Sequence, residues 1–159
     1  MDVQRSHAEW RQSLARLWAD GIPLATSMGV EIRRLDEAGL ELAAPLPPNR
    51  NHMGSAFGGS LQGLATLAGW GVTFVTAGTP GARHVVVRDA RMRFDHPVTG
   101  ELRARAAMPS PEYAAAFRAV LAARGRARLA VAVKIVGESG LVAARFEGEF
   151  VAFGAPAPD

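Results

Sequence analysis

Hydrophobic residues recur at the spacing of an α-helix in three stretches of the chain. The first has tryptophan and leucine on one face, and Gly21 and Pro23 are expected to end it. The second, which ends at Gly78, is apolar on nearly every side, as in a helix that other elements surround. The third follows Ser110, a helix-capping residue, and stops at Gly125. The predicted helices run from Ala8 to Ala19, from Phe57 or Gly58 to Ala77, and from Pro111 to about Ala123.

Elsewhere hydrophobic and polar residues alternate, which is the pattern of strands with one buried face. Val30 and Ile32 alternate with Glu31, and the turn Asp36–Gly39 leads into a second alternating run, as in a hairpin. The predicted strands are Met28 to Leu35, Leu40 to Ala44, Arg83 to Asp95, Glu101 to Met108, Ala127 to Ile135 and Leu141 to Phe153. In the third strand, alternation predicts one face with Val86, Arg88, Ala90, Met92 and Phe94, and another with Val85, Val87, Asp89, Arg91 and Arg93.

The order of these elements predicts an α+β fold. A helix and two strands precede the long apolar helix, and four strands with one inserted helix follow it, so every later strand connection can be antiparallel. We expect one curved antiparallel sheet of about six strands wrapped around the central helix. The 159 residues show no internal repeat or linker, so a single domain over residues 1–159 is expected. Its N-terminal helix lies within residues 1–21, and residues 154–159 form a frayed tail.

The amino-acid composition limits the kinds of site and ligand that the chain can have. The chain has no cysteine, which removes thiolate catalysis and zinc–thiolate sites and fits a cytoplasmic location. The N-terminal residues lack the apolar core of a signal peptide, and the polar and glycine residues of the apolar helix favour burial in the fold over a membrane span. Nearly all cations are arginine, with Lys134 the only lysine, but no basic block indicates nucleic-acid binding. The histidines lack metal-site spacing, so we predict no metal.

The loop before the apolar helix is the most informative segment for function. Pro45, Pro47 and Pro48 end the second strand, and a loop of about ten residues follows, a length that is often functional. The first amides of a helix have no internal partner and carry the positive end of its dipole. The pair Gly58 and Gly59 would let a ligand approach those amides, which could stabilise an oxyanion. Glycines needed only for helix packing are the alternative.

The same loop carries a family resemblance. The string Asn51-x-x-Gly54-x-x-Phe57-Gly58-Gly59 resembles the Asn-x-x-Gly-x-x-His-Gly-Gly signature of hotdog-fold acyl-CoA thioesterases, with Phe57 in place of histidine. A putative-thioesterase branch of that superfamily, also found fused to GNAT acetyltransferases, is similar over nearly all of Ile22 to Phe153. The similar runs are Ile22-Pro-Leu, Met28-Gly-Val, Ala44-Pro-Leu, Asn49-x-Asn-His52, Ala56-Phe-Gly-Gly-Ser-Leu61, Leu64-Ala-Thr-Leu-Ala-Gly-Trp-Gly71, Pro97-Val-Thr-Gly100 and Gly125-Arg-Ala-Arg-Leu129.

This resemblance implies a hotdog fold and a homodimer, with a tetramer as the alternative. The strand Arg83 to Asp95 would pair with its twin, and the active sites would lie at the subunit interface. The substrate would be an acyl-CoA or acyl-carrier thioester, with coenzyme A present only as part of the substrate and no separate cofactor. The oxyanion donor maps to Gly58 or Gly59. Many relatives carry a catalytic carboxylate seven residues after the second glycine, where this chain has Thr66.

Several residues are therefore candidates for the site. The proposed catalytic residues are Asn51, His52, Gly58, Gly59 and Thr66, and the proposed substrate-binding residues are Phe57, Ser60, Asp89 and Arg91. Histidine suits acid–base chemistry near neutral pH, and asparagine can position a water or a carbonyl group. Simpler roles compete: a loop histidine bonded to the backbone, an Asx turn at Asn51, a helix cap at Ser60, and an arginine partner for Asp89. We expect Trp70 to pack in the core, and His84 and His96 to be structural or solvated.

Three functions compete on this fold. The first is hydrolysis of an acyl thioester by water, and the second is binding of such a thioester without catalysis, which the missing carboxylate favours. The third is a hydratase or dehydratase that pairs a histidine with a carboxylate on the central helix. The predicted helix from Gly58 to Ala77 contains no Asp or Glu, which argues against this third function.

Overall fold

The computed structural model describes residues 5–78, 82 and 84–154. Its helices are α1 (His7–Gly21), α2 (Pro23–Met28), the 3₁₀ turn η1 (Pro47–Asn49), α3 (Gly58–Ala77) and α4 (Pro111–Arg124). Its strands are β1 (Glu31–Leu35), β2 (Gly39–Ala44), β3 (His84–Phe94), β4 (Leu102–Ala107), β5 (Arg126–Val136) and β6 (Val142–Phe153). Arg83, most of the turn after α3, and residues 155–159 of the expected tail lie outside the described residues.

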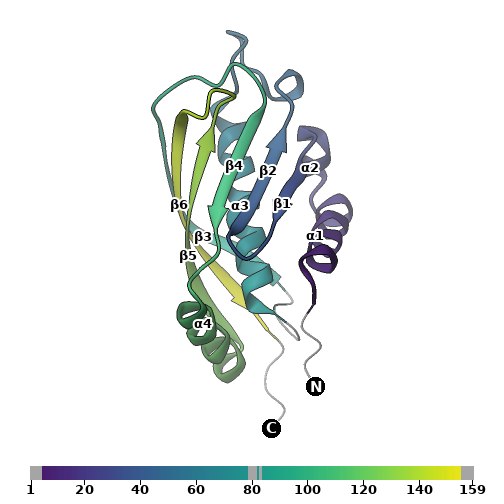
Figure 1. Cartoon of the computed structure of the whole chain (residues 1–159), viewed down its shortest axis with the longest axis vertical. Coiled ribbons are helices and arrows are strands. Elements are labelled where there is room, and N and C mark those ends of the chain that lie inside the picture. Colours follow the sequence, from purple (N-terminus) through teal and green to yellow (C-terminus); the bar gives the residue numbers. More distant parts are fainter. Residues whose placement is uncertain (1–4, 79–81, 83, 155–159) are drawn as a thin grey trace.

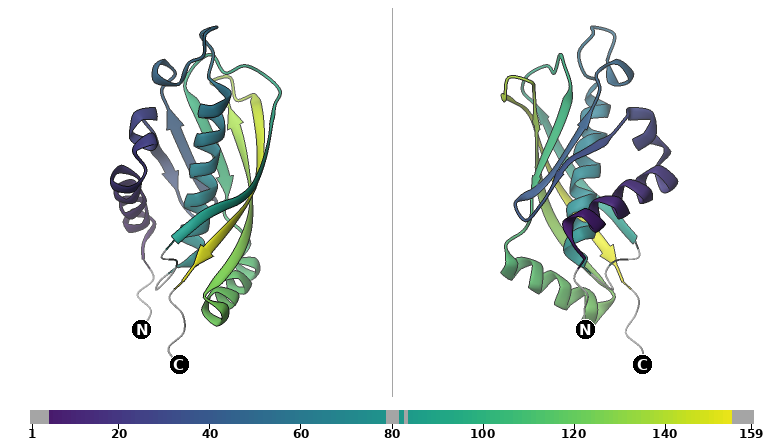
Figure 2. Two further views of the ribbon diagram at one scale, coloured as in Figure 1. Left: turned by 180° about the vertical axis from the view of Figure 1, so that it is seen from behind. Right: turned by 45° about the vertical axis from the view of Figure 1, so that its right-hand side comes forward.

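One antiparallel sheet contains all six strands, in the order β1-β2-β4-β5-β6-β3. The sheet curves around α3, as Figures 1 and 2 show, while α1 and α2 lie beside the β1 edge. The expectation of an α+β fold with a curved antiparallel sheet around one long helix is therefore confirmed. The strands β1 and β3 form the two edges, and β3 is the longer of them.

Helix α3 is buried because small residues let the sheet approach its backbone. A Cβ atom on Gly69 would lie 2.4 Å from the ring of Phe150, a fully buried residue of β6. A Cβ on Gly71 would lie 2.6 Å from a methyl group of Leu40. Glycine costs roughly 1 kcal/mol of helix propensity relative to alanine, and close packing at these positions offsets that cost.

Helix α1 covers the C-terminal half of α3, and Met28 of α2 lies against Gly63 in the other half. A capping box at Ser6 and Glu9 starts α1, whose tryptophans pack edge-on against aromatic residues of α3. Trp70 also donates a hydrogen bond to the carbonyl oxygen of Val85 at 2.7 Å, so its expected role in packing is confirmed.

The first helix ends at Gly21, as expected, but the expectation that a strand begins at Met28 was wrong, because a second helix comes first. Pro23 occupies the first turn of a second helix, where its missing N–H costs nothing, and Met28 is the last residue of this helix. Gly29 then adopts φ 71° and turns the chain, so β1 begins only at Glu31. The other predicted elements are present, with ends that differ by one or two residues.

A β-bulge in β3 changes the faces predicted for this strand. The register to β6 shifts between Val87 and Asp89, so that Val87 lies opposite Phe150 whereas Ala90 lies opposite Gly148. Val85 and Val87 therefore share the helix-facing side with Ala90, Met92 and Phe94. Asp89, Arg91 and Arg93 share the outer side with Val86. Simple alternation failed here because the extra residue of a bulge reverses every later side chain.

Candidate active site

The loop before α3 is organised by Asn51. Its side-chain oxygen accepts hydrogen bonds from the amides of Met53 at 2.9 Å and Ser55 at 3.2 Å, and its side-chain amide donates to the Ser55 hydroxyl at 2.9 Å. Gly54 takes φ 81° within the same turn. The structure thus places Asn51 in the Asx turn that was its alternative reading. The turn uses one of the two hydrogens of the Asn51 side-chain amide, so a catalytic role for Asn51 would have to use the other.

Asn49 shapes the site but was not among the predicted site residues. Its side chain is 1% exposed and donates to the carbonyl oxygens of Met28 at 2.8 Å and Pro45 at 2.7 Å. Its own carbonyl oxygen accepts the amide of Phe57, the residue before α3, at 2.7 Å. Asn49 therefore ties the end of α2 and the end of β2 to the start of α3. The available signal was an asparagine directly after a proline pair, which is equally typical of an exposed turn.

Helix α3 begins with two backbone amides that have no hydrogen-bond partner among the described residues. Phe57 is the N-cap residue, and no side chain caps the helix, so the alternative role of Ser60 as a helix cap is wrong. The amides of Ser60 and Leu61 both donate to the carbonyl oxygen of Phe57. Within the described residues, no hydrogen bond uses the amides of Gly58 or Gly59. Such amides at a helix start are suited to binding a negative or partly negative oxygen.

Two aromatic rings flank these amides. The Phe57 ring is 57% exposed and lies over Gly59, where a Cβ would meet it at 2.5 Å. The Phe94 ring, from the end of β3, lies against Gly58, where a Cβ would be 3.5 Å away. Phe94 is 51% exposed and was not among the predicted site residues. The two rings give the helix start an apolar surround, in which hydrogen bonds to a ligand are stronger than in water.

The predicted polar residues are only partly brought together. Thr66 is half-buried about two turns into α3, and its hydroxyl donates to the carbonyl oxygen of Gln62 at 2.8 Å, which leaves it able to accept a hydrogen bond. Ser60 is half-buried in the first turn. His52 is exposed in the loop, and no hydrogen bond or ion pair of the described residues involves it.

Asp89 and Arg91 lie elsewhere in the chain. They project from the outer side of β3, opposite Glu149 and Glu147 of β6, and line an open hollow of ≈ 850 Å³ on that side. The sheet separates this hollow from α3. Within one chain, neither residue is therefore part of the site at the start of α3.

Among the described residues, no group of three or more His, Asp or Glu side chains is arranged to hold a metal ion. In the same part of the chain, no helix is both long and apolar enough to cross a membrane.

The curved sheet, its strand order and the helix it encloses define a hotdog fold, the class shared by the solved structures that resemble this chain. The chain belongs to the family described as putative thioesterase (yiiD_Cterm), whose model matches residues 11–154. The family supports a thioesterase-type function and an acyl thioester as the kind of substrate.

Three solved structures illustrate this similarity. A protein of unknown function from Chlorobaculum tepidum is 28% identical, with 96% of this chain and 98% of that chain covered and a TM-score of 0.89. A putative thioesterase from Shewanella oneidensis is 25% identical over 92% of this chain and 99% of that one, with a TM-score of 0.78. The Escherichia coli PaaI protein from the phenylacetic acid degradation operon is 17% identical over 96% and 100%, with a TM-score of 0.69, and shows the fold alone.

Proposed function

We propose that this protein hydrolyses an acyl thioester of coenzyme A or of an acyl carrier protein at the start of α3. The supporting observation is the pair of unpaired amides at Gly58 and Gly59 in the described structure, beside two partly exposed aromatic rings. The thioester carbonyl oxygen would accept hydrogen bonds from these amides. Attack by water on the carbonyl carbon would form an oxyanion there, and the amides would stabilise its charge. Cleavage of the carbon–sulfur bond then releases the acid and the thiol, which takes up a proton.

The attacking water needs a group that orients it and accepts its proton. Thr66 occupies the position of the catalytic carboxylate in many relatives, and its free lone pairs can accept a hydrogen bond from water. Threonine is not a base at neutral pH without activation, so we assign it orientation only. His52 is the proposed base, because it is an exposed imidazole on the loop that leads into α3. Ser60 would contact the ligand, because it does not cap the helix.

We further propose that the active unit is a homodimer joined through β3. This strand is a long sheet edge with exposed valines at positions 86 and 87, which natural proteins rarely leave uncovered. Asp89 lies opposite Glu149, a like charge, and has no ion-pair partner among the described residues. If two β3 strands pair antiparallel about Ala90, Asp89 of each chain lies opposite the partner's Arg91. The strand is thus self-complementary in charge.

The function is tested by following free thiol release from a panel of acyl-CoAs of different chain length. The informative pair of variants is Gly58→Pro and Gly58→Ala. Proline is well tolerated at the first position of a helix, and Phe57 before it is already extended at ψ 133°, so Gly58→Pro should remove one amide donor while keeping the helix start. We expect kcat to fall about 10²- to 10³-fold in Gly58→Pro, as for other lost oxyanion donors. Gly58→Ala keeps the amide and should stay near wild type.

The results separate the competing functions. Equal kcat in Gly58→Pro and Gly58→Ala would remove the Gly58 amide from the oxyanion site. His52→Ala should impair hydrolysis more than folding, and unchanged activity would exclude His52 as the base. Saturable binding of acyl-CoAs without thiol release at any chain length would support the second candidate, a binding protein, which the absence of a carboxylate on α3 favours.

A further inference from the structure

The outer face of the sheet carries a row of cations that crosses four strands. Arg105 of β4 lies directly opposite Lys134 of β5, Lys134 lies opposite Arg145 of β6, and Arg145 lies opposite Arg93 of β3. Like charges in directly opposed positions destabilise a sheet. Three such pairs in succession therefore need an explanation other than the stability of the fold.

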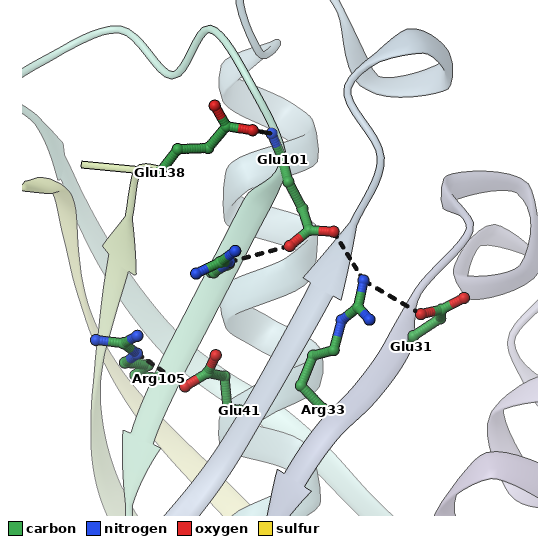
Figure 3. A network of polar contacts seen from close by, with 7 residues as sticks. Glu31, Arg33, Glu41, Glu101, Arg105 and Glu138 are labelled. Carbon is green, nitrogen blue, oxygen red and sulfur yellow. Dashed lines mark hydrogen bonds and ion pairs between the residues drawn. The ribbon is translucent and has the colours of Figure 1, made fainter. Parts of the chain in front are cut away.

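The other half of the same face shows no such excess. Figure 3 shows Arg33 of β1 between Glu31 and Glu101, the residue before β4, and Arg105 of β4 against Glu41 of β2. Arg103 likewise pairs with Glu101. Each cation in this half has a carboxylate partner, so this half is balanced.

In the half formed by β5, β6 and β3, the row of cations has fewer carboxylates than cations around it. Asp95 is shared between Arg93 at 2.8 Å and Arg145 at 3.4 Å. Its hydrogen bond to Arg93 and the charges of both arginines hold the pKa of Asp95 below its usual value, so it remains a carboxylate. Lys134 has no ion-pair partner among the described residues. The group of Arg93, Arg145, Lys134 and Asp95 therefore carries a net charge of +2, three cations less one carboxylate.

This cationic group borders a hollow at the end of β3. An open hollow of ≈ 620 Å³ is lined by Arg93, Asp95, His96, Gly140, Leu141, Val142 and Arg145. Arg93 and Phe94 are neighbours on opposite sides of β3, and Phe94 lies against Gly58 at the start of α3. The hollow is thus separated from the candidate active site only by the end of this edge strand.

We infer that this hollow binds the phosphate groups of the coenzyme A nucleotide, with the pantetheine arm passing around the end of β3 to the start of α3. The inference rests on the proposed thioesterase function and selects acyl-CoA over an acyl carrier protein as its substrate. Guanidinium groups match phosphate oxygens in geometry, and two of them are held here by one carboxylate. Lys134 adds a point charge beside them, and His96 lines the rim.

Calorimetric titration tests this inference without requiring hydrolysis. Coenzyme A, 3′-dephospho-coenzyme A and pantetheine are compared as ligands of the wild-type protein, where affinity should fall in that order and salt should weaken only the first two. Arg145→Gln should weaken coenzyme A binding about tenfold and leave pantetheine binding unchanged. Lys134→Glu should also weaken coenzyme A binding. It should not destabilise the fold, because it places a carboxylate between Arg105 and Arg145.

Arg128→Gln is the matched control. Arg128 is on the same face of β5, six residues and so roughly 20 Å from Lys134, and both side chains are exposed. Equal affinity for coenzyme A and pantetheine, or an equal loss in Arg128→Gln, would overturn the inference. The inference would also fail if Arg145→Gln and Lys134→Glu weakened binding of an acyl carrier protein but not of coenzyme A, since the row of cations would then dock an acidic protein. If coenzyme A binds as expected but no acyl-CoA is hydrolysed, the nucleotide site stands and the proposed hydrolysis fails.

Discussion

At the scale of single residues, two asparagines near each other in the loop have different tasks. The side chain of Asn51 forms hydrogen bonds within the loop itself, to Met53 and Ser55. The side chain of Asn49 is buried and donates hydrogen bonds to carbonyl groups at the ends of two other elements. The position of α3 relative to β2 and α2 therefore depends on Asn49, whereas the shape of the exposed loop depends on Asn51.

We predict that Asn49→Ala lowers the free energy of unfolding by about 2 kcal/mol, because it leaves the carbonyl oxygens of Met28 and Pro45 without their donor. Asn49→Asp should lower it further at neutral pH, since a buried carboxylate would face the same carbonyl oxygens. Urea denaturation monitored by circular dichroism measures both. The control is Asn51→Ala, expected to cost at most about 1 kcal/mol because its partners can bond to water. Equal losses at the two positions would contradict the assignment of Asn49.

The sequence could not distinguish these two residues. Both stand in a segment rich in proline, asparagine and glycine, where an Asx turn is the ordinary expectation. Burial of Asn49 follows from the return of the chain over the end of α2, a helix that the pattern did not predict. The unpaired amides at Gly58 and Gly59 could be predicted because a helix start creates unpaired amides wherever it occurs. Phe94 was missed because it reaches the site from another element.

At the scale of elements, predictability followed the regularity of the backbone. The strand β5 alternates from Arg126 to Ile135, and α3 is a long, mostly apolar run that ends at a glycine, so both were predicted. The bulge near Arg88 interrupts β3 without any glycine or proline to mark it, so the outer position of Asp89 and Arg91 could not be predicted. The short helix α2 was missed because Pro23 is compatible with both a helix stop and a helix start.

The glycines of α3 give a prediction at this scale. Gly69→Ala should lower the free energy of unfolding by about 1 to 2 kcal/mol, because overpacking against the buried ring of Phe150 outweighs the gain in helix propensity. Gly63→Ala is the matched control in the same helix. There the new Cβ would be 3.4 Å from the flexible thioether of Met28, so stability should stay equal or rise by up to about 1 kcal/mol. Thermal unfolding of both variants measures the difference, and stabilisation by Gly69→Ala would show that the sheet can yield there.

At the scale of the whole molecule, the two sheet edges differ in what covers them. The β1 edge is shielded by α1 and α2, as Figure 2 shows. The β3 edge has no such cover in the described part of the chain, and it is the longest unpaired stretch of backbone in the sheet. Because the candidate site lies at the end of β3, pairing of this edge with a second chain would also shape the site. Oligomeric state and activity are therefore expected to change together.

A charge swap on β3 tests this pairing. Asp89→Arg should weaken the dimer, because the introduced guanidinium would then face the partner's Arg91 in both copies of the contact, and like charges directly opposed across strands are unfavourable. The double variant Asp89→Arg with Arg91→Asp restores opposite charges and should restore the dimer, which no loss of folding could mimic. Sedimentation velocity over a range of concentrations measures the dissociation constant of each variant. Thiol release from acyl-CoA, measured at the same concentrations, should fall in the single variant and recover in the double variant. A dimer of unchanged strength in the single variant would place the two-fold axis away from Ala90, and a monomeric wild type would remove the interface from the proposed site.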